Sequence, residues 1–350
     1  MATCAVMTGT FWYMPELSVL IPARREEWLA RTCADVLEHA ELDTEVIAVI
    51  DGEHLGDRPA PHPRLRLIEL RESIGQRAAT NLAAHESRAH YVMKLDAHSS
   101  LDAGFDRKIV AALEGHSDWT LVLTQRNLHV FDWQCVACGH RTYMGPTLPQ
   151  CEKCGFTEMQ KRVMVWKPRG GTRTDFWRFD HELHFQYRGQ WQGRRLEDAD
   201  GQIADTMSLL GACFMMSQER YLELGGLDES HGSWGQMGTE IACKTWLSGG
   251  RLVVHRGTWY AHMFRTRADF SFPYQMQWSI QEKAREYSRN MWLNDAWPRQ
   301  VLSLAWLVNK FKPLPGWHES AGAEALRHIR ESERNFYRTH ERLDKKAIYA

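Results

Sequence analysis

Short apolar runs alternate with amphipathic stretches along the first 125 residues of the chain. The apolar runs predict β-strands at residues 17–21, 45–50, 65–70, 91–95 and 120–124. The stretches between them predict helices at residues 26–39, 73–88 and 105–113. Strands that alternate with helices are typical of a parallel sheet covered by helices. We therefore expect an α/β fold that binds its ligand at the carboxyl ends of the strands, where Asp51 and Asp96 lie.

The pattern changes beyond residue 130. Residues 130–133 and 162–166 look like strands that lead into and out of a cysteine-rich stretch, and residues 170–195 mix aromatic side chains with arginines. Residues 209–216 and 252–255 are further apolar runs, of which the second predicts a last strand. From residue 272 onward the composition favours helices, and we expect tryptophans to anchor their packing at Trp278, Trp292, Trp297 and Trp306.

Composition and charge narrow the class of protein. The chain has 350 residues with 43% hydrophobic and 25% charged residues, which is typical of a globular protein rather than a disordered one. A net charge of -1 argues against attraction of the whole molecule to nucleic acid, although it does not exclude a local basic patch. The sequence contains no run of 18 apolar residues, so it predicts no membrane span. The first 22 residues do not resemble a secretory signal. We expect a cytoplasmic protein without a membrane partner; the sequence leaves its oligomeric state open.

Four of the eight cysteines form two closely spaced pairs, at Cys135, Cys138, Cys151 and Cys154. Each pair has the spacing Cys-x-x-Cys followed by glycine, and 12 residues separate the pairs. Four thiolates from two such turns suit a tetrahedral Zn²⁺ that has no open position, so we expect a structural zinc ribbon. The alternatives are a pair of redox dithiols or ordinary buried cysteines.

A second candidate metal site lies just past the strand at residues 91–95. Asp96 and His98 are two residues apart, so both side chains can point into the ligand crevice. A carboxylate oxygen and an imidazole nitrogen suit a divalent ion such as Mn²⁺. Taken alone, the pair is more typical of a helix cap followed by a solvent-exposed histidine.

Several motifs resemble family-2-like glycosyltransferases of the GT-A fold, in the order that family has them. Residues 18–22 and 46–52 resemble the family's opening strands, and 95–98 resemble the Asp-x-His metal motif of polypeptide N-acetylgalactosaminyltransferases. Residues 225–250 and 260–265 resemble that family's acceptor-side segment and its His-x-Phe-Arg motif. The resemblance spans residues 16–297 apart from the cysteine-rich insert. It implies a Rossmann-like GT-A domain at 16–300. The cysteine pairs add a zinc-ribbon insertion at 131–166, and the composition of the C-terminal part adds a helical extension at 301–350.

The resemblance also implies roles for individual residues. The implied ligands of an active-site Mn²⁺ or Mg²⁺ are Asp96, His98 and His262. The implied contacts to a UDP-linked sugar are Pro22, Asp51, Arg77, Asn81, Asp96, Trp234 and Arg265. Arg265 would meet the diphosphate, where a guanidinium can neutralise the charge that grows on the leaving group.

This chain also departs from the family pattern. The family's Trp-Gly-Gly-Glu-Asn is Trp-Gly-Gln-Met-Gly at residues 234–238, so the identity of the sugar stays open. We expect transfer with retention of the anomeric configuration, in which the leaving phosphate accepts the acceptor proton. If the enzyme inverts instead, a carboxylate must act as base, with Glu240 as first candidate and Asp228 as second. Alternatively, Glu240 pairs with a cation or caps a helix, and Asp228 belongs to a turn.

The sequence does not decide the acceptor. Arginines and aromatic rings at residues 170–195, together with a zinc ribbon, are compatible with DNA that carries a hydroxymethylated pyrimidine, as in a bacteriophage. Protein and glycan acceptors stay open, as does a ribbon that only braces the fold. A non-enzymatic alternative is a zinc-ribbon binding module on an inactive transferase scaffold.

Overall fold

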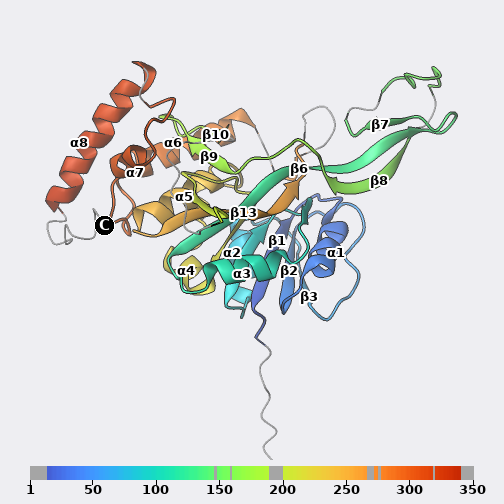
Figure 1. Ribbon diagram of the computed structural model, residues 1–350, viewed down its shortest axis with the longest axis horizontal. Coiled ribbons are helices and arrows are strands. Elements are labelled where there is room, and N and C mark those ends of the chain that lie inside the picture. The colour runs from blue at the N-terminus through green and yellow to red at the C-terminus, as the bar shows by residue number, and fades with distance from the viewer. Residues whose placement is uncertain are drawn as a thin grey trace, which may run out of the picture.

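The computed structural model describes residues 14–146, 149–157, 160–188, 200–265, 272–274, 277–317 and 320–339. Within these ranges one mixed sheet of eleven strands forms the centre of the molecule (Figure 1). Its strands are β1 (Leu17–Ala23), β2 (Thr44–Asp51), β3 (Leu65–Leu70), β4 (Tyr91–Leu95), β5 (Ser99–Leu101), β6 (Trp119–Cys135), β7 (Arg141–Tyr143), β8 (Gln160–Pro168), β11 (Ile203–Asp205), β12 (Cys213–Ser217) and β13 (Arg251–His262). The predicted α/β fold is confirmed.

The helices and the remaining strands pack around this sheet. The helices are α1 (Leu29–His39), α2 (Gln76–Glu86), α3 (Phe105–Leu113), α4 (Gln218–Glu223), η1 (Glu229–His231), α5 (Met237–Leu247), α6 (Trp278–Trp292), α7 (Leu304–Lys310), η2 (Ser320–Gly322) and α8 (Ala323–Thr339). A separate hairpin joins β9 (Phe176–Phe179) to β10 (Phe185–Arg188). None of the helices in the described ranges is both long enough and apolar enough to cross a membrane.

The N-terminal strands form a parallel core with the order β4-β1-β2-β3. Every residue of β1 and β2 is buried, because α1 packs on β2 while α2 packs on β1 and β2. Burial on both faces explains why these strands read as continuous apolar runs rather than as alternating patterns. The carboxyl ends of β1, β2 and β4 lie at one edge of the sheet, which is where the site forms.

Two predicted helices begin later than their sequence pattern suggests. The first begins at Leu29, because the side chain of Glu26 is buried in contacts with the site and accepts a hydrogen bond from the Trp28 amide at 3.3 Å. The second begins at Gln76, because the preceding loop donates hydrogen bonds to Asp51 at the end of β2. In both cases residues with helical composition form the loop that shapes the site.

Strand β6 is longer than predicted. The separate strands expected at residues 120–124 and 130–133 form one strand of 17 residues. Its first half pairs with β12 and β13 in the body, and its second half pairs with β7 and β8. Strand β13 is also longer than the predicted 252–255, with a register shift between His255 and Trp259. This extension brings His262 beside Asn127 of β6.

The second half of β6 forms, with β7 and β8, an arm that projects from the body (Figure 1). Three aromatic residues pack at its base, with ring centroids 6.1 Å apart between Trp28 and Phe131 and also between Trp28 and Trp166. The indole of Trp166 donates to the buried carboxylate of Asp35 on α1 at 2.8 Å. These contacts fix the base of the arm to the body.

Two sequence predictions about aromatic residues need correction. Phe176, Trp177 and Phe179 are fully buried in the core, so they are not exposed rings for stacking on a base. Trp278, an expected packing anchor, is 73% exposed at the start of α6. The other anchors pack as predicted at Trp292, Trp297 and Trp306. Residues 189–199 lie outside the described residues, and the domain bounds stay predictions.

Candidate active site

Asp96, His98 and His262 come together although 166 residues separate the first from the last. Asp96 follows β4, His98 precedes β5, and His262 ends β13, which pairs with β5. The Nε2 atom of His262 lies 3.2 Å from Oδ2 of Asp96 and 3.0 Å from Nε2 of His98. The structure therefore gathers the three predicted ligands into one cluster, which we call the Asp-His cluster.

The chemistry of the Asp-His cluster suits a divalent cation. Two imidazole nitrogens face each other at 3.0 Å with a carboxylate oxygen beside them. Burial lowers the pKa of His262 to about 4, so its ring is neutral at pH 7 and offers a lone pair. Burial alone raises the pKa of Asp96, but Lys94 and His262 outweigh it and hold that pKa below its ordinary range. A carboxylate and two imidazole nitrogens fit Mn²⁺.

Glu26 is a residue of this site that the sequence analysis missed. Its carboxylate accepts from Nδ1 of His98 at 2.9 Å and from Nη2 of Arg265 at 2.6 Å. A proton held on Nδ1 leaves Nε2 of His98 free to bind a metal. Burial raises the pKa of Glu26, but His98 and Arg265 outweigh it and lower the pKa overall. Its position just past β1, at the same sheet edge as Asp51 and Asp96, was the signal that could have identified it.

A cavity of about 440 Å³ opens beside the Asp-His cluster. Four of the predicted nucleotide-sugar contacts line it, namely Pro22, Asp96, Trp234 and Arg265. Its wall also includes His184 and Phe185 from the β9–β10 hairpin and Gln236 from the loop before α5. The cavity is therefore bounded on one side by the ends of the parallel strands and on the other by segments from the second half of the chain.

Asp51 lies behind this cavity rather than in its wall. Its buried carboxylate accepts from Ser73 Oγ at 2.8 Å and from the amides of Ile74 and Gly75 at 2.6 and 3.0 Å. The hydroxyl of Tyr274, which does line the cavity, donates to the same carboxylate at 2.9 Å. Tyr274, and not Asp51, therefore faces the cavity in this structure.

The predicted nucleotide contacts on α2 hold a loop instead. The guanidinium of Arg77 is buried and donates to Glu240 at 3.1 Å and to the carbonyl of Gly232 at 3.0 Å. Asn81 donates to the carbonyl of Leu227 and accepts from its amide, both at 2.9 Å. Neither side chain lines the cavity, so both position the loop before α5 from behind.

Glu240 and Asp228 also lie outside the cavity wall. Glu240 is fully buried and accepts from Arg77 at 3.1 Å, from Lys244 at 2.8 Å and from the Asp228 amide at 2.6 Å. Asp228 accepts from the Ser230 amide at 3.0 Å and from the Tyr287 hydroxyl at 2.9 Å. The geometry favours the alternatives of a buried ion pair and a turn over the role of catalytic base.

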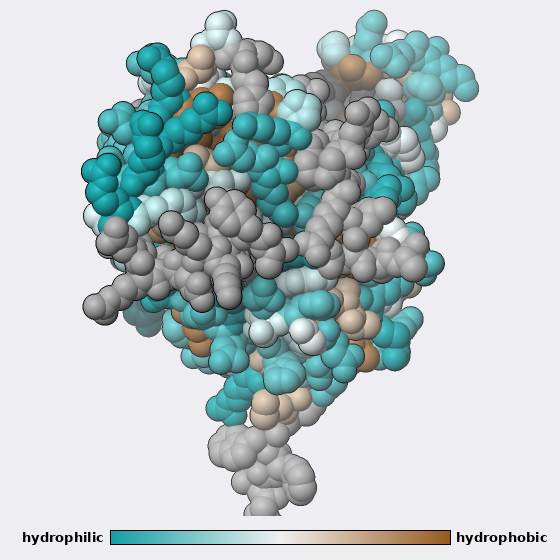
Figure 2. Space-filling view, turned by 60° about the vertical axis from the view of Figure 1, so that its left-hand side comes forward, coloured by the Kyte–Doolittle hydropathy of each residue, from teal (hydrophilic) through white to brown (hydrophobic). Residues whose placement is uncertain are grey.

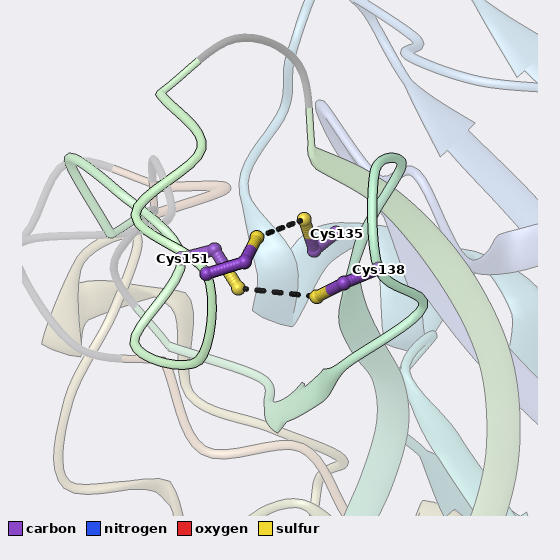
Figure 3. A group of neighbouring side chains, drawn as sticks. Cys135, Cys138 and Cys151 are labelled. Carbon is purple, nitrogen blue, oxygen red and sulfur yellow. Dashed lines mark hydrogen bonds between the residues drawn. The ribbon is translucent and has the colours of Figure 1, made fainter.

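The four paired cysteines converge on the arm (Figure 3). The sulfurs of Cys135 and Cys154 are 3.7 Å apart, and those of Cys138 and Cys151 are 3.6 Å apart. Both turns close in the same way, since the amides of Gly139 and Gly155 donate to the carbonyls of Cys135 and Cys151 at 2.9 and 2.8 Å. We call this group the Cys cluster. Four convergent thiols without a disulfide fit a tetrahedral metal such as Zn²⁺.

Comparison with protein families finds a match for the N-terminal part of the chain. Residues 18–132 match the model of glycosyl transferase family 2. We use the term family 2 domain for this matched stretch only. This family 2 domain includes Asp96 and His98 and ends within the arm, whereas His262 and Arg265 lie beyond the matched residues.

Curated relatives extend the likeness beyond the family 2 domain. Polypeptide N-acetylgalactosaminyltransferase 4 of Mus musculus is 25% identical, over 91% of this chain and 56% of the relative. Polypeptide N-acetylgalactosaminyltransferase 3 of Homo sapiens is 24% identical, over 74% of this chain and 38% of the relative. The chain thus spans about half the length of the curated relatives that it matches.

A solved structure supports the same fold. The crystal structure of GalNAc-T7 with UDP, GalNAc and Mn2+ superposes with a TM-score of 0.60 and 16% identity, over 94% of this chain and 57% of that chain. The predicted GT-A fold is confirmed.

Proposed function

We propose that this protein is a metal-dependent glycosyltransferase that moves a sugar from a UDP-linked donor to a hydroxyl group. The observation that supports it most is the convergence of Asp96, His98 and His262 beside a cavity that Arg265 also lines. The match of residues 18–132 to glycosyl transferase family 2 also supports it. A solved protein of the same fold is described with UDP and Mn2+. The inactive-scaffold alternative is disfavoured because the ligand set is intact.

The Asp-His cluster, Arg265 and Glu26 each have a role in this chemistry. A bound Mn²⁺ would supply a Lewis acid for the diphosphate, held by the Asp-His cluster. Arg265 lines the cavity close to the cluster, where its guanidinium can neutralise charge on the leaving group. Glu26 orients both His98 and Arg265, so one buried carboxylate couples the metal ligand to the phosphate-binding cation.

We propose that the anomeric configuration is retained. In this reaction the bond from the sugar C1 to the diphosphate oxygen breaks, the acceptor oxygen bonds to C1 on the same face, and the acceptor proton passes to the leaving phosphate. Among the described residues, the only carboxylates in the cavity wall are Glu26 and Asp96, and both are already bonded to His98, His262 or Arg265. This supports a reaction without a dedicated base.

Two acceptor classes have specific support. The curated relatives are named as polypeptide transferases, which favours a protein hydroxyl. A nucleic-acid hydroxyl, such as that of a hydroxymethylated pyrimidine, depends on the surface of the arm described below. A cytoplasmic location stays a prediction from the sequence alone.

A donor screen tests the proposal. The purified protein with Mn²⁺ is offered UDP-glucose, UDP-galactose and their N-acetyl forms, and release of UDP is measured alone, with a serine- and threonine-rich peptide, and with hydroxymethylated DNA. We expect release with at least one donor, its loss with EDTA or in Asp96→Asn, and no change in the surface control Asp57→Asn. Absence of UDP release with all four donors would refute the proposal, and an inverted linkage in the product would refute retention.

A further inference from the structure

Positive charge is concentrated on the arm. Residues 128–169 contain six lysines and arginines against three aspartates and glutamates, whereas the whole chain has a net charge of -1. In Figure 2 the arm stands out at the upper right as a largely hydrophilic projection. A basic patch on an otherwise neutral protein indicates a site for a polyanion.

The pairing of β6 with β7 and β8 gathers this charge on one face of the arm. Arg141 and Lys161 are both register partners of Gln134, and directly opposite residues of antiparallel strands share a face. Tyr143 is the partner of Asp132, which lies two residues before Gln134 and therefore on the same face. Two cations and an aromatic ring thus lie side by side along the ribbon.

Two further cations lie closer to the body. Lys167 is the register partner of His129 beyond a register shift in the pairing of β6 with β8, and the ring centroid of His129 lies 4.6 Å from that of Tyr143. The guanidinium of Arg169 stacks over the ring of Tyr143, 4.5 Å from its centroid. We call the whole set the basic face, and its members are Arg141, Tyr143, Lys161, Lys167 and Arg169.

The basic face is exposed and its charges are available. All five side chains are exposed, with Tyr143 at 41%. Across the part of the chain that the structure describes, none of the four cations makes an ion pair. Asp132, the acidic residue on this face, is bonded to His129 at 2.8 Å. These cations are therefore free to contact a ligand.

The basic face begins beside the Asp-His cluster. The amide of Arg169 donates to the carbonyl of Asn127 at 2.7 Å, and Asn127 is the register partner of the metal ligand His262. From there the cations continue along β8 and β7 to the Cys cluster at the far end of the arm. The charged row thus connects the two predicted metal sites.

We propose that the basic face binds a single strand of nucleic acid and leads a hydroxyl on that strand toward the Asp-His cluster. Lys161 is the register partner of Gln134, and the Arg169 amide bonds to Asn127, which lies seven residues earlier on β6. This separation is about 23 Å, which is enough to follow several backbone phosphates. The Arg-stacked ring of Tyr143 offers a platform for an unpaired base, which an acidic peptide would not use. The inference rests on the proposed function for its chemistry, whereas binding of the strand is independent of it.

Fluorescence anisotropy with a labelled 20-nucleotide single-stranded DNA tests the proposal. We expect the triple variant Arg141→Ala/Lys161→Ala/Lys167→Ala to bind at least tenfold more weakly in low salt. Its slope of log affinity against log salt should be shallower by about 2, because three phosphate contacts are lost. The matched control removes the same charge from exposed positions on α8, with Arg327→Ala/Arg330→Ala/Arg334→Ala, and should bind like the wild type.

The aromatic platform has its own test. Tyr143→Ala should weaken binding about tenfold, and Tyr143→Phe should restore it, because stacking needs the ring and not the hydroxyl. The proposal is overturned if the triple variant binds with unchanged affinity and salt slope, if a polyglutamate peptide competes as well as the DNA, or if a duplex of the same sequence binds more tightly.

Failure of this inference is distinguishable from failure of the proposed function. Release of UDP from donors is measured on the wild-type protein without DNA, and DNA binding is measured without donor. UDP release without DNA binding would overturn the basic face as a nucleic-acid site and leave the transferase in place. DNA binding without UDP release would overturn the transferase function and leave the basic face in place as a nucleic-acid site.

Discussion

The Asp-His cluster and the Cys cluster are built in opposite ways. All four cysteines lie within 20 residues, and two short turns with the same hydrogen bonds present their sulfurs. Asp96 and His262 are 166 residues apart and meet only because β13 pairs with β5 and β6. The first cluster is a property of local turns, whereas the second exists only when the whole sheet is folded. Removing a metal from each should therefore have different consequences.

Loss of metal from the Cys cluster should have the largest effect, confined to the arm. Structural zinc contributes about 10–16 kcal/mol of binding free energy that is also folding free energy. In Cys151→Ser we expect loss of bound zinc and of hydrogen-exchange protection at residues 135–156, with protection of β1 and β2 unchanged. Native mass spectrometry measures the bound zinc, and mass spectrometry after hydrogen exchange measures the protection of each segment. In the control variant Cys33→Ala, we expect one zinc ion per chain, as in the wild type. Unfolding of the body in Cys151→Ser would contradict the separation of the two clusters.

Loss of a ligand from the Asp-His cluster should have the opposite signature. In His262→Ala we expect Mn²⁺-dependent UDP release to fall about a thousandfold, because the charge on the diphosphate loses its Lewis acid. Hydrogen exchange in the arm and the melting temperature should change little. The matched control is His328→Ala on α8, whose ring bonds to Asn294 at 2.8 Å. Equal rates in His262→Ala and the wild type would remove His262 from the ligand set.

A substitution of the buried Glu240 tests whether its carboxylate stabilises the fold or takes part in catalysis. In Glu240→Gln, Arg77 and Lys244 remain buried without their partner, so we expect a loss of about 3–5 kcal/mol in the free energy of unfolding. UDP release per folded molecule should stay within a few-fold. Burial raises the pKa of Glu240, but Lys244 and Arg77 outweigh it and lower it overall. The network therefore stabilises the protein at neutral pH and loses this effect as the pH falls, which denaturant titrations at several pH values would detect in the wild type only.

The smallest effect is expected behind the Asp-His cluster. Glu26→Gln keeps an acceptor for His98 but loses the charge, so Mn²⁺ affinity should fall about tenfold, as for other residues that orient metal ligands. Calorimetric titration with Mn²⁺ measures this directly. The neighbouring Glu27→Gln, an exposed partner of Arg162, is the control and should bind Mn²⁺ like the wild type. Unchanged affinity in Glu26→Gln would show that its contact with His98 does not affect the metal.

The same contrast explains what the sequence could predict. The βαβ order and the cysteine turns follow from short-range pattern, so both were predicted from neighbouring residues alone. The role of His262 came from resemblance, because no local pattern shows that β13 extends past a register shift to reach Asp96. Glu26 was missed and Glu240 was given a chemical role for the same reason. Which buried carboxylates meet a ligand and which meet Arg77 depends on long-range packing, and a charged residue looks the same in both cases.

Strand β6 has a consequence for how this protein could change over time. The strand passes from the body into the arm without a break, so the arm continues the pleat of the sheet. Side chains alternate between faces with a period of two, and an insertion of one residue near Asn127 would turn every side chain beyond it to the opposite face. Lengthening or grafting of the arm should therefore succeed in steps of two residues, or in an odd step that a bulge absorbs, as β8 does between Met164 and Lys167.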